Sequence, residues 1–174
     1  MQQLLLNLET VAVPTLDTFV PGQNTEVLYL LHQIAEGQSR DRFIYIWGDS
    51  AVGKTHLLKA MSQLCPAKFL TSLSPIEEFT YDPRKTLYLI DDCDKLSSEK
   101  QIAAFSLFNQ VRENRTACMI TTGSDSPLAL TLRDDLKSRL CWGLVYQIKG
   151  LTDEEKIAAL TEQARQRGFT HSQG

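Results

Sequence analysis

The sequence predicts an α/β fold built on a five-stranded, mainly parallel sheet flanked by helices. Short aromatic and β-branched runs alternate with helical segments along the chain, which is typical of strand–helix–strand units. A glycine-rich turn, GDSAVGKT at residues 48–55, lies between such a run and a helical segment. The 174 residues are enough for one domain with its own core, and they contain no internal repeat.

The first elements have clear local signals. Residues 24–37 predict a helix because apolar residues recur at helical spacing, with Asn24 as the N-cap and Gly37 as the end. RFIYIW at 42–47 is an apolar, aromatic run that predicts a buried strand. KTHLLKAMSQL at 54–64 predicts the helix that follows the glycine-rich turn.

The remaining elements continue the alternation. A helix is predicted over residues 97–114, with Ser97 or Ser98 as its cap, and a short amphipathic helix over 134–143. A last helix begins at Thr152, where Glu155 completes a capping box, and ends at Gly168. Strands are predicted over residues 68–73, 86–92, 116–122 and 143–150.

Composition excludes several classes of protein. The net charge of −3 argues against a surface that binds nucleic acid throughout, although it allows a local basic patch. The four cysteines form no C-x-x-C pair, so we expect neither a zinc site nor a thioredoxin-type centre, and isolated cysteines fit a reducing cytoplasm. No apolar stretch approaches the ~20 residues that span a bilayer, and the N-terminus lacks the basic flank of a secretory signal.

The turn at 48–55 matches the phosphate-binding pattern G-x-x-x-x-G-K-[ST], known as the P-loop, in the required strand–helix context. Glycines let successive N–H groups point at phosphate oxygens, and the helix N-terminus favours the same anion. Lys54 is expected at the β- and γ-phosphates and Thr55 at Mg²⁺. The predicted nucleotide-binding residues are Gly48, Asp49, Ser50, Ala51, Val52, Gly53, Lys54, Thr55 and His56.

Carboxylates follow the predicted strand LYLIDD. Asp91 comes at its carboxyl end, where open α/β sheets bind ligands, and is expected to hold Mg²⁺. Asp92 is expected to orient the attacking water. The alternative is that Asp92 only leads into the next helix. The next strand ends in TTGSDS, which places Thr122, Ser124 and Asp125 as candidates beside the γ-phosphate, or in a plain polar turn.

An arginine near the end of the 134–143 helix allows two interpretations. Arg139 is either a solvated surface residue or a group that completes the nucleotide site of a neighbouring molecule, as arginine fingers do. Residues and spacing alone do not decide between them.

Together these segments resemble a known family. TFVPGQN at 18–24, GDSAVGKTHLL, LYLIDD, FSLFNQV, ITTGSDSP and LKSRLCWG are similar to the AAA+ core of the bacterial replication initiator DnaA. They are most similar to its shortened relatives, the Hda-type regulatory inactivators. The resemblance implies ATP or ADP with Mg²⁺ as cofactors and an adenine pocket at Phe19 and Val20. It also implies that Arg139 acts as an arginine finger in trans toward ATP-bound DnaA.

The opening segment QLLLNL has three interpretations from its composition: a buried strand, a failed signal peptide, or a docking peptide. Hda-type proteins carry a Q-L-x-L-x-L peptide that binds the sliding clamp, the β subunit of DNA polymerase III. By this resemblance, Gln3, Leu4, Leu6 and Leu8 are the clamp-binding residues, and Asn7 stands where the family usually has proline. Three parts are then expected: a clamp-binding peptide at 1–10, an AAA+ domain at 11–150, and the start of a mostly absent helical lid at 151–174.

The function implied is a cytoplasmic, replisome-associated bacterial regulator that stimulates ATP hydrolysis by DnaA and thereby inactivates it. Its own ATPase activity is expected to be weak or absent. The resemblance allows a homo-oligomer and implies no sequence-specific DNA binding and no membrane. Two alternatives remain: a stand-alone ATPase of helicase-loader type, and an adaptor that holds nucleotide as a structural ligand.

Overall fold

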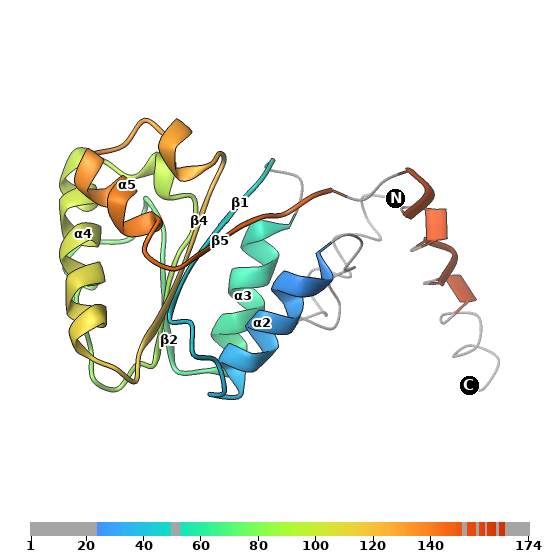
Figure 1. The fold of residues 1–174 in the computed structure, drawn as a ribbon, viewed down its shortest axis with the longest axis horizontal. Helices are drawn as coiled ribbons and strands as arrows, with labels where there is room; N and C mark the ends of the chain where they lie inside the picture. The colour runs from blue at the N-terminus through green and yellow to red at the C-terminus, as the bar shows by residue number, and fades with distance from the viewer. Residues whose placement is uncertain are drawn as a thin grey trace.

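A computed structural model describes residues 24–49 and 53–150, together with 153–155, 157, 158, 160–162, 164 and 165. Its centre is one sheet with strand order β2-β3-β4-β1-β5, in which every neighbouring pair is parallel (Figure 1). The predicted five-stranded sheet is therefore confirmed. The order reverses beside β1, and the carboxyl ends at such a reversal are where open α/β sheets bind ligands.

The strands are shorter than the sequence pattern predicts. They are β1 (Phe43–Trp47), β2 (Ala67–Leu70), β3 (Leu87–Ile90), β4 (Cys118–Gly123) and β5 (Leu144–Gln147). β3 is buried at all four positions, because helices cover both faces of the parallel sheet. It ends before Asp91, whose carboxylate lies outside the strand and close to β4.

Helices form a layer on each side of the sheet. Figure 1 shows α2 (Thr25–Ala35) and α3 (Lys54–Leu64) on one face, and α4 (Ser98–Glu113) and α5 (Asp134–Leu140) on the other. Short 3₁₀ turns, η2 (Ile76–Glu78), η3 (Cys93–Lys95) and η4 (Pro127–Ala129), lie in the connections. The described residues between 153 and 165 are helical, as predicted, whereas Thr152 of the expected capping box lies outside the described residues.

The core has two halves, one on each face of the sheet. On the α2–α3 side, Leu31, Leu57 and Met61 pack against Ile46 of β1 without solvent exposure. On the opposite side, residues of α4 and α5 such as Leu107 and Leu136 cover β3 and β4. Within the described residues, no helix is long and apolar enough to cross a membrane.

Local signals at the helix ends gave mixed results. Ser97 caps α4 as predicted, because its hydroxyl accepts the Lys100 N–H at 3.3 Å. Gly37 lies just past α2 with a φ of 71°, which glycine adopts without strain. Asn24 is the N-cap residue of α2, as predicted, but its side chain makes no capping hydrogen bond. Its amide instead pairs with the backbone of Lys149, at 2.9 Å for both bonds, and so ties the start of α2 to the chain after β5.

Candidate nucleotide-binding site

The P-loop follows β1 and leads into α3. Gly53 precedes α3 with a φ of 92°, a left-handed conformation that favours glycine. Lys54 begins the helix and is only 4% exposed. Its ammonium donates to the carbonyls of Gly48 and Asp49, the latter at 3.0 Å, so its charge is held at the loop.

Some predicted nucleotide contacts fall outside the structural description. Ser50, Ala51 and Val52 of the loop are among them, and so are Phe19 and Val20 of the expected adenine pocket. His56 lies in the first turn of α3 and is half-buried.

The P-loop and the end of β3 meet through two oxygen-bearing side chains. Asp91 is 4% exposed. The Thr55 hydroxyl donates to its Oδ2 at 2.6 Å. A hydroxyl and a carboxylate are oxygen ligands of the kind that Mg²⁺ prefers, alongside phosphate and water. Together with the ammonium of Lys54 and the left-handed conformation of Gly53, they fit a nucleoside triphosphate or diphosphate with its Mg²⁺.

Thr122 connects the two aspartates. Its side chain is fully buried. The hydroxyl donates to Oδ1 of Asp91 at 2.7 Å and accepts the Asp92 backbone N–H at 2.9 Å. Asp92 has a φ of 49°, the one positive φ at a non-glycine residue in the described part of the chain. The bond from its N–H helps to hold a conformation that L residues rarely adopt.

The other two residues predicted beside the γ-phosphate have different partners. The Ser124 hydroxyl donates to Asp94 at 3.0 Å. The backbone carbonyl of Asp125 accepts the buried Tyr45 hydroxyl at 2.6 Å, while its carboxylate caps the next N–H. Burial raises the pKa of Tyr45 above its ordinary range, so this hydroxyl stays a donor. Of the three residues, only Thr122 forms a hydrogen bond to Asp91 or Asp92 within the described part of the chain.

Arg139 lies between two aromatic rings. Its guanidinium carbon is 4.2 Å from the ring centroid of Trp142 and 4.5 Å from that of Phe105 on α4. Its Nε donates to the Asn109 side chain at 3.1 Å. Among the described residues it forms no ion pair. Cation–π contacts and one hydrogen bond therefore orient the plane of this guanidinium.

This arginine is placed away from the P-loop of its own chain. Trp142 packs edge-on against Phe43 with 5.5 Å between ring centroids. Phe43 begins β1, whereas the P-loop follows Trp47 at the other end of that five-residue strand, about 13 Å farther along. Figure 1 also shows α5 and α3 on opposite faces of the sheet. Arg139 thus belongs to an outward-facing α4–α5 surface.

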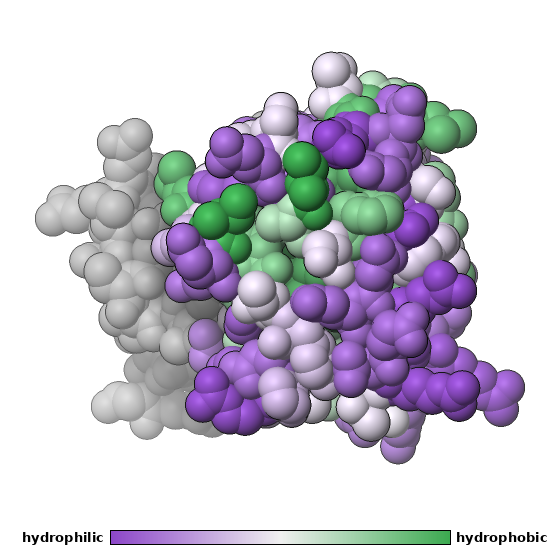
Figure 2. Space-filling view, turned by 90° about the vertical axis from the view of Figure 1, so that its left-hand side faces the viewer, coloured by the Kyte–Doolittle hydropathy of each residue, from purple (hydrophilic) through white to green (hydrophobic). Residues whose placement is uncertain are grey.

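Figure 2 shows that α4–α5 side of the molecule, where hydrophobic side chains gather among hydrophilic ones. Ile102 of α4 is 50% exposed and Leu128 of η4 is 80% exposed. α5, which carries Arg139, packs against both α4 and η4, the two elements that carry these exposed apolar side chains. An exposed apolar patch of this kind marks interaction sites more often than plain surface.

Comparisons with known proteins add the family and the fold. No protein-family model matches the chain. An uncharacterized protein of Haemophilus influenzae is 34% identical over 182 aligned residues, covering 97% of this chain and 78% of that protein. The chain belongs to the family of this Haemophilus protein.

Similar solved structures show the fold of this chain. AMPPCP-bound DnaA from Aquifex aeolicus aligns with a TM-score of 0.73 at 22% identity, covering 88% of this chain and 54% of that one. Domain III of the Thermotoga maritima replication initiation protein DnaA aligns with a TM-score of 0.72 at 21% identity, covering 88% and 74%. The fold is therefore the AAA+ P-loop fold, as predicted, and the chain spans about half the length of the Aquifex protein.

Sequence reasoning missed the residues that hold Arg139. Phe105 and Asn109 are four apart in FSLFN, a spacing that places both on one face of α4. That spacing was readable from the sequence. Their contact with Arg139, thirty residues along the chain from Asn109, was not.

Proposed function

We propose that this protein is an AAA+ regulator of bacterial replication initiation. In this proposal it binds ATP or ADP with Mg²⁺ at its own P-loop, and it supplies Arg139 to the nucleotide site of ATP-bound DnaA. Hydrolysis there yields the inactive ADP-bound initiator. The observation that carries the proposal is the position of Arg139, which is held by two rings on the α4–α5 side and lies away from its own P-loop.

The chain's own residues have separable tasks at its nucleotide. Lys54 would contact the phosphates, and Thr55 with Asp91 would hold Mg²⁺, which neutralises phosphate charge when it is bound. Thr122 keeps the Asp91 carboxylate turned toward Thr55 and holds the backbone of Asp92. The bound nucleotide would stabilise the conformation in which the AAA+ domain contacts DnaA.

The task of Arg139 is electrostatic. Negative charge on the transferred phosphoryl group must be stabilised in the transition state, and an arginine delivered in trans contributes about 10³–10⁵-fold to such rates. Stacking on Phe105 and Trp142 restricts the guanidinium before the partner arrives. Less rotational freedom is then lost on binding. Ile102 and Leu128 would supply apolar contact area around it.

A hydrolysis assay tests the arginine. ATP-loaded DnaA is mixed with clamp loaded on DNA and with wild-type protein, Arg139→Ala or Arg133→Ala, and ADP formation is followed. Arg133 is a matched control, because it pairs with Asp135 beside the same helix and is not stacked on Trp142. We expect Arg139→Ala to stimulate ATP hydrolysis by DnaA at least about 100-fold less than wild type, and Arg133→Ala to stimulate it as well as wild type. Full stimulation by Arg139→Ala would show that the finger role is wrong.

Recruitment by the clamp is the second half of the proposal. Gln3, Leu4, Leu6 and Leu8 lie outside the described residues, so the support is the resemblance of QLLLNL to the family's clamp-binding peptide. Gln3→Ala combined with Leu6→Ala should abolish binding to immobilised clamp, while Asn7→Pro should strengthen it by preorganising the peptide. Unchanged affinity in the double variant would contradict clamp docking.

A second candidate function follows from Asp91 and Asp92, which could serve turnover of the chain's own ATP. ATP turnover by the purified protein, measured with and without DnaA and clamp, distinguishes the regulator from the stand-alone ATPase. Steady turnover that DnaA and clamp do not alter, and that Asp92→Asn removes, favours a stand-alone ATPase. Nucleotide that co-purifies and never exchanges favours a structural adaptor.

A further inference from the structure

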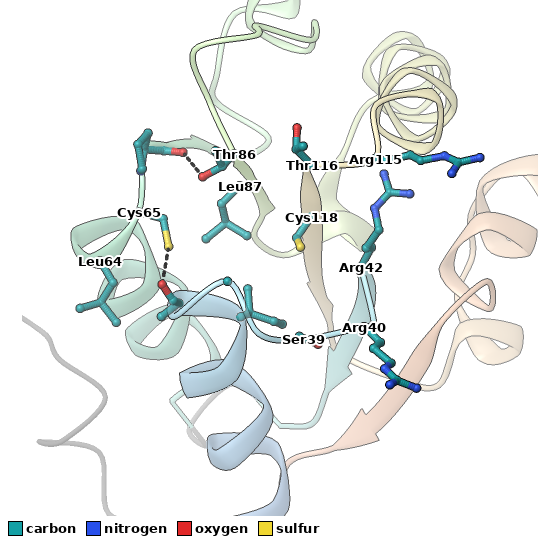
Figure 3. A pocket seen from close by; sticks show the side chains of 14 residues that line it. Ser39, Arg40, Arg42, Leu64, Cys65, Thr86, Leu87, Arg115, Thr116 and Cys118 are labelled. Atoms are coloured by element: carbon teal, nitrogen blue, oxygen red, sulfur yellow. Dashed lines mark hydrogen bonds between the residues drawn. The ribbon is translucent and has the colours of Figure 1, made fainter.

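A cavity of about 670 Å³ lies at the edge of the sheet opposite the P-loop. It is formed where α2, α3 and α4 end and where β1, β3 and β4 begin (Figure 3). This volume is within the range of about 300–1,000 Å³ that ligand sites occupy. Its lining residues include neither the described P-loop residues nor Arg139.

One side of the cavity is apolar and carries two thiols. Leu64 and Cys65 come from the end of α3, Leu87 from β3, and Cys118 from the start of β4. Figure 3 shows Leu87 between the two cysteines. Leu64 is 51% exposed although it ends a helix whose other apolar residues are buried. An apolar side chain entering here would bury surface that is now in contact with water.

The other side is cationic. Arg40, Arg42 and Arg115 line it, and no carboxylate does, although the chain has 21 acidic residues and a net charge of −3. Glu36 and Asp41 are close in sequence but are not among the lining residues. In Figure 3 the three arginines lie on the side of the cavity away from Leu64 and Cys65, with Arg42 between Arg40 and Arg115, whose side chains extend outward in different directions.

The three arginines differ in what they already bind. Arg42 donates to backbone carbonyls at the end of α4 and just beyond, at 2.8 Å to Asn114 and 2.9 Å to Ala117, so its role is structural. Arg40 and Arg115 are exposed, and neither has a hydrogen bond or an ion pair within the described part of the chain. Arg40 and Arg115 thus place two guanidinium groups, unpaired within the described residues, at the rim of the cavity.

We propose that this cavity binds an acidic peptide segment of a partner protein. An apolar side chain of the peptide would lie against Leu64 and Leu87, and its carboxylates would pair with Arg40 and Arg115. Guanidinium groups match carboxylates in a bidentate geometry. A small metabolite would need a more enclosed site, whereas here Arg40, Leu64 and Arg115 are all exposed at the rim. The inference does not depend on the function proposed for Arg139.

Binding is measured with a synthetic probe, fluorescein-labelled Glu-Leu-Asp-Leu-Glu, by fluorescence anisotropy. The matched peptide has lysine at the three acidic positions. Arg40→Glu with Arg115→Glu should weaken binding of the acidic probe at least about tenfold. The control pair, Lys59→Glu with Lys149→Glu, changes the net charge equally outside the cavity and should stay within about twofold. Both side chains replaced in the test variant are exposed, so equal melting temperatures are expected.

Thiol labelling locates the bound probe. The acidic peptide should slow maleimide modification of Cys65 and Cys118, read by mass spectrometry, and leave the exposed Cys141 unchanged. Absence of binding at millimolar probe, equal binding of the lysine peptide, or unprotected cavity cysteines would overturn the proposal. So would a single-stranded oligonucleotide that binds through Arg40 and Arg115 when the acidic peptide does not.

Discussion

Replacing Thr122 by valine tests whether this hydroxyl organises the two aspartates. Valine keeps the shape of the side chain and removes one oxygen. That oxygen makes two bonds in a fully buried position: it donates to Asp91 at 2.7 Å and accepts the Asp92 N–H at 2.9 Å. The substitution therefore leaves the Asp92 N–H, in a partly buried position, without its partner and the Asp91 carboxylate without one of its donors.

The expected cost follows from these two bonds. A hydrogen bond to a charged group contributes about 1.5–3 kcal/mol and a neutral one about 0.5–1.5 kcal/mol. Burial of the added methyl group returns at most about 0.8 kcal/mol. We expect Thr122→Val to lower the free energy of unfolding by about 2–3 kcal/mol, which corresponds to a melting temperature lower by about 4–12 °C for a chain of this size. Thr122→Ser keeps both bonds and should lose only about 1 kcal/mol.

Urea denaturation in EDTA without nucleotide measures this loss. A fluorescent ADP analogue, titrated with Mg²⁺ or with EDTA, then measures the function. Thr122→Val should reduce the Mg²⁺-dependent part of the affinity, because Asp91 is no longer held toward Thr55. Stability within about 0.5 kcal/mol of wild type, or equal losses in Thr122→Val and Thr122→Ser, would refute the reasoning.

Three further predictions follow from single positions. Lys54→Ala should weaken nucleotide binding at least about 100-fold, because it removes the buried cation that the proposed function assigns to the phosphates, whereas Lys59→Ala on the exposed face of the same helix should leave titration curves unchanged. Gly143→Ala should destabilise the protein in urea melts by more than about 2 kcal/mol, because an added Cβ would lie 1.9 Å from the Phe43 carbonyl oxygen; a fully stable variant would contradict this packing. Burial raises the pKa of the Cys118 thiol, so its thiolate forms at higher pH. The alkylation rate of Cys118 should therefore increase at a higher pH than the rate of an unperturbed thiol, whose pKa is about 8.5.

Much of the fold could be predicted because its signals are local. The P-loop spacing, the buried run of β3 and the cap at Ser97 each depend on a few adjacent residues. The strand ends differ from the prediction, because an apolar pattern alone does not show where pairing stops. Asn24 shows the limit clearly. Its position before a helix predicted a cap, yet its amide binds a residue 125 positions away.

In the candidate site too, some residues could be predicted from local motifs and some contacts could not. Lys54, Thr55 and Asp91 were predicted from motifs, and the structure brings them together at the carboxyl ends of β1 and β3. The contact between Thr122 and both aspartates depends on β3 and β4 being neighbours in the sheet. A pattern that specifies residue types cannot specify which hydroxyl reaches which oxygen.

By itself, the sequence determined the α/β alternation, the P-loop and the acidic end of β3, because residue type and short-range spacing decide backbone angles and burial. Only the tertiary structure decided the surroundings of Arg139 and the cavity at the opposite edge. Phe105, Arg139 and Trp142 come from two helices and a loop, and the cavity is lined by parts of the chain from Ile34 to Cys118. Contacts of this kind form when separate elements pack on one sheet, so their chemistry is a property of the packed sheet and helices.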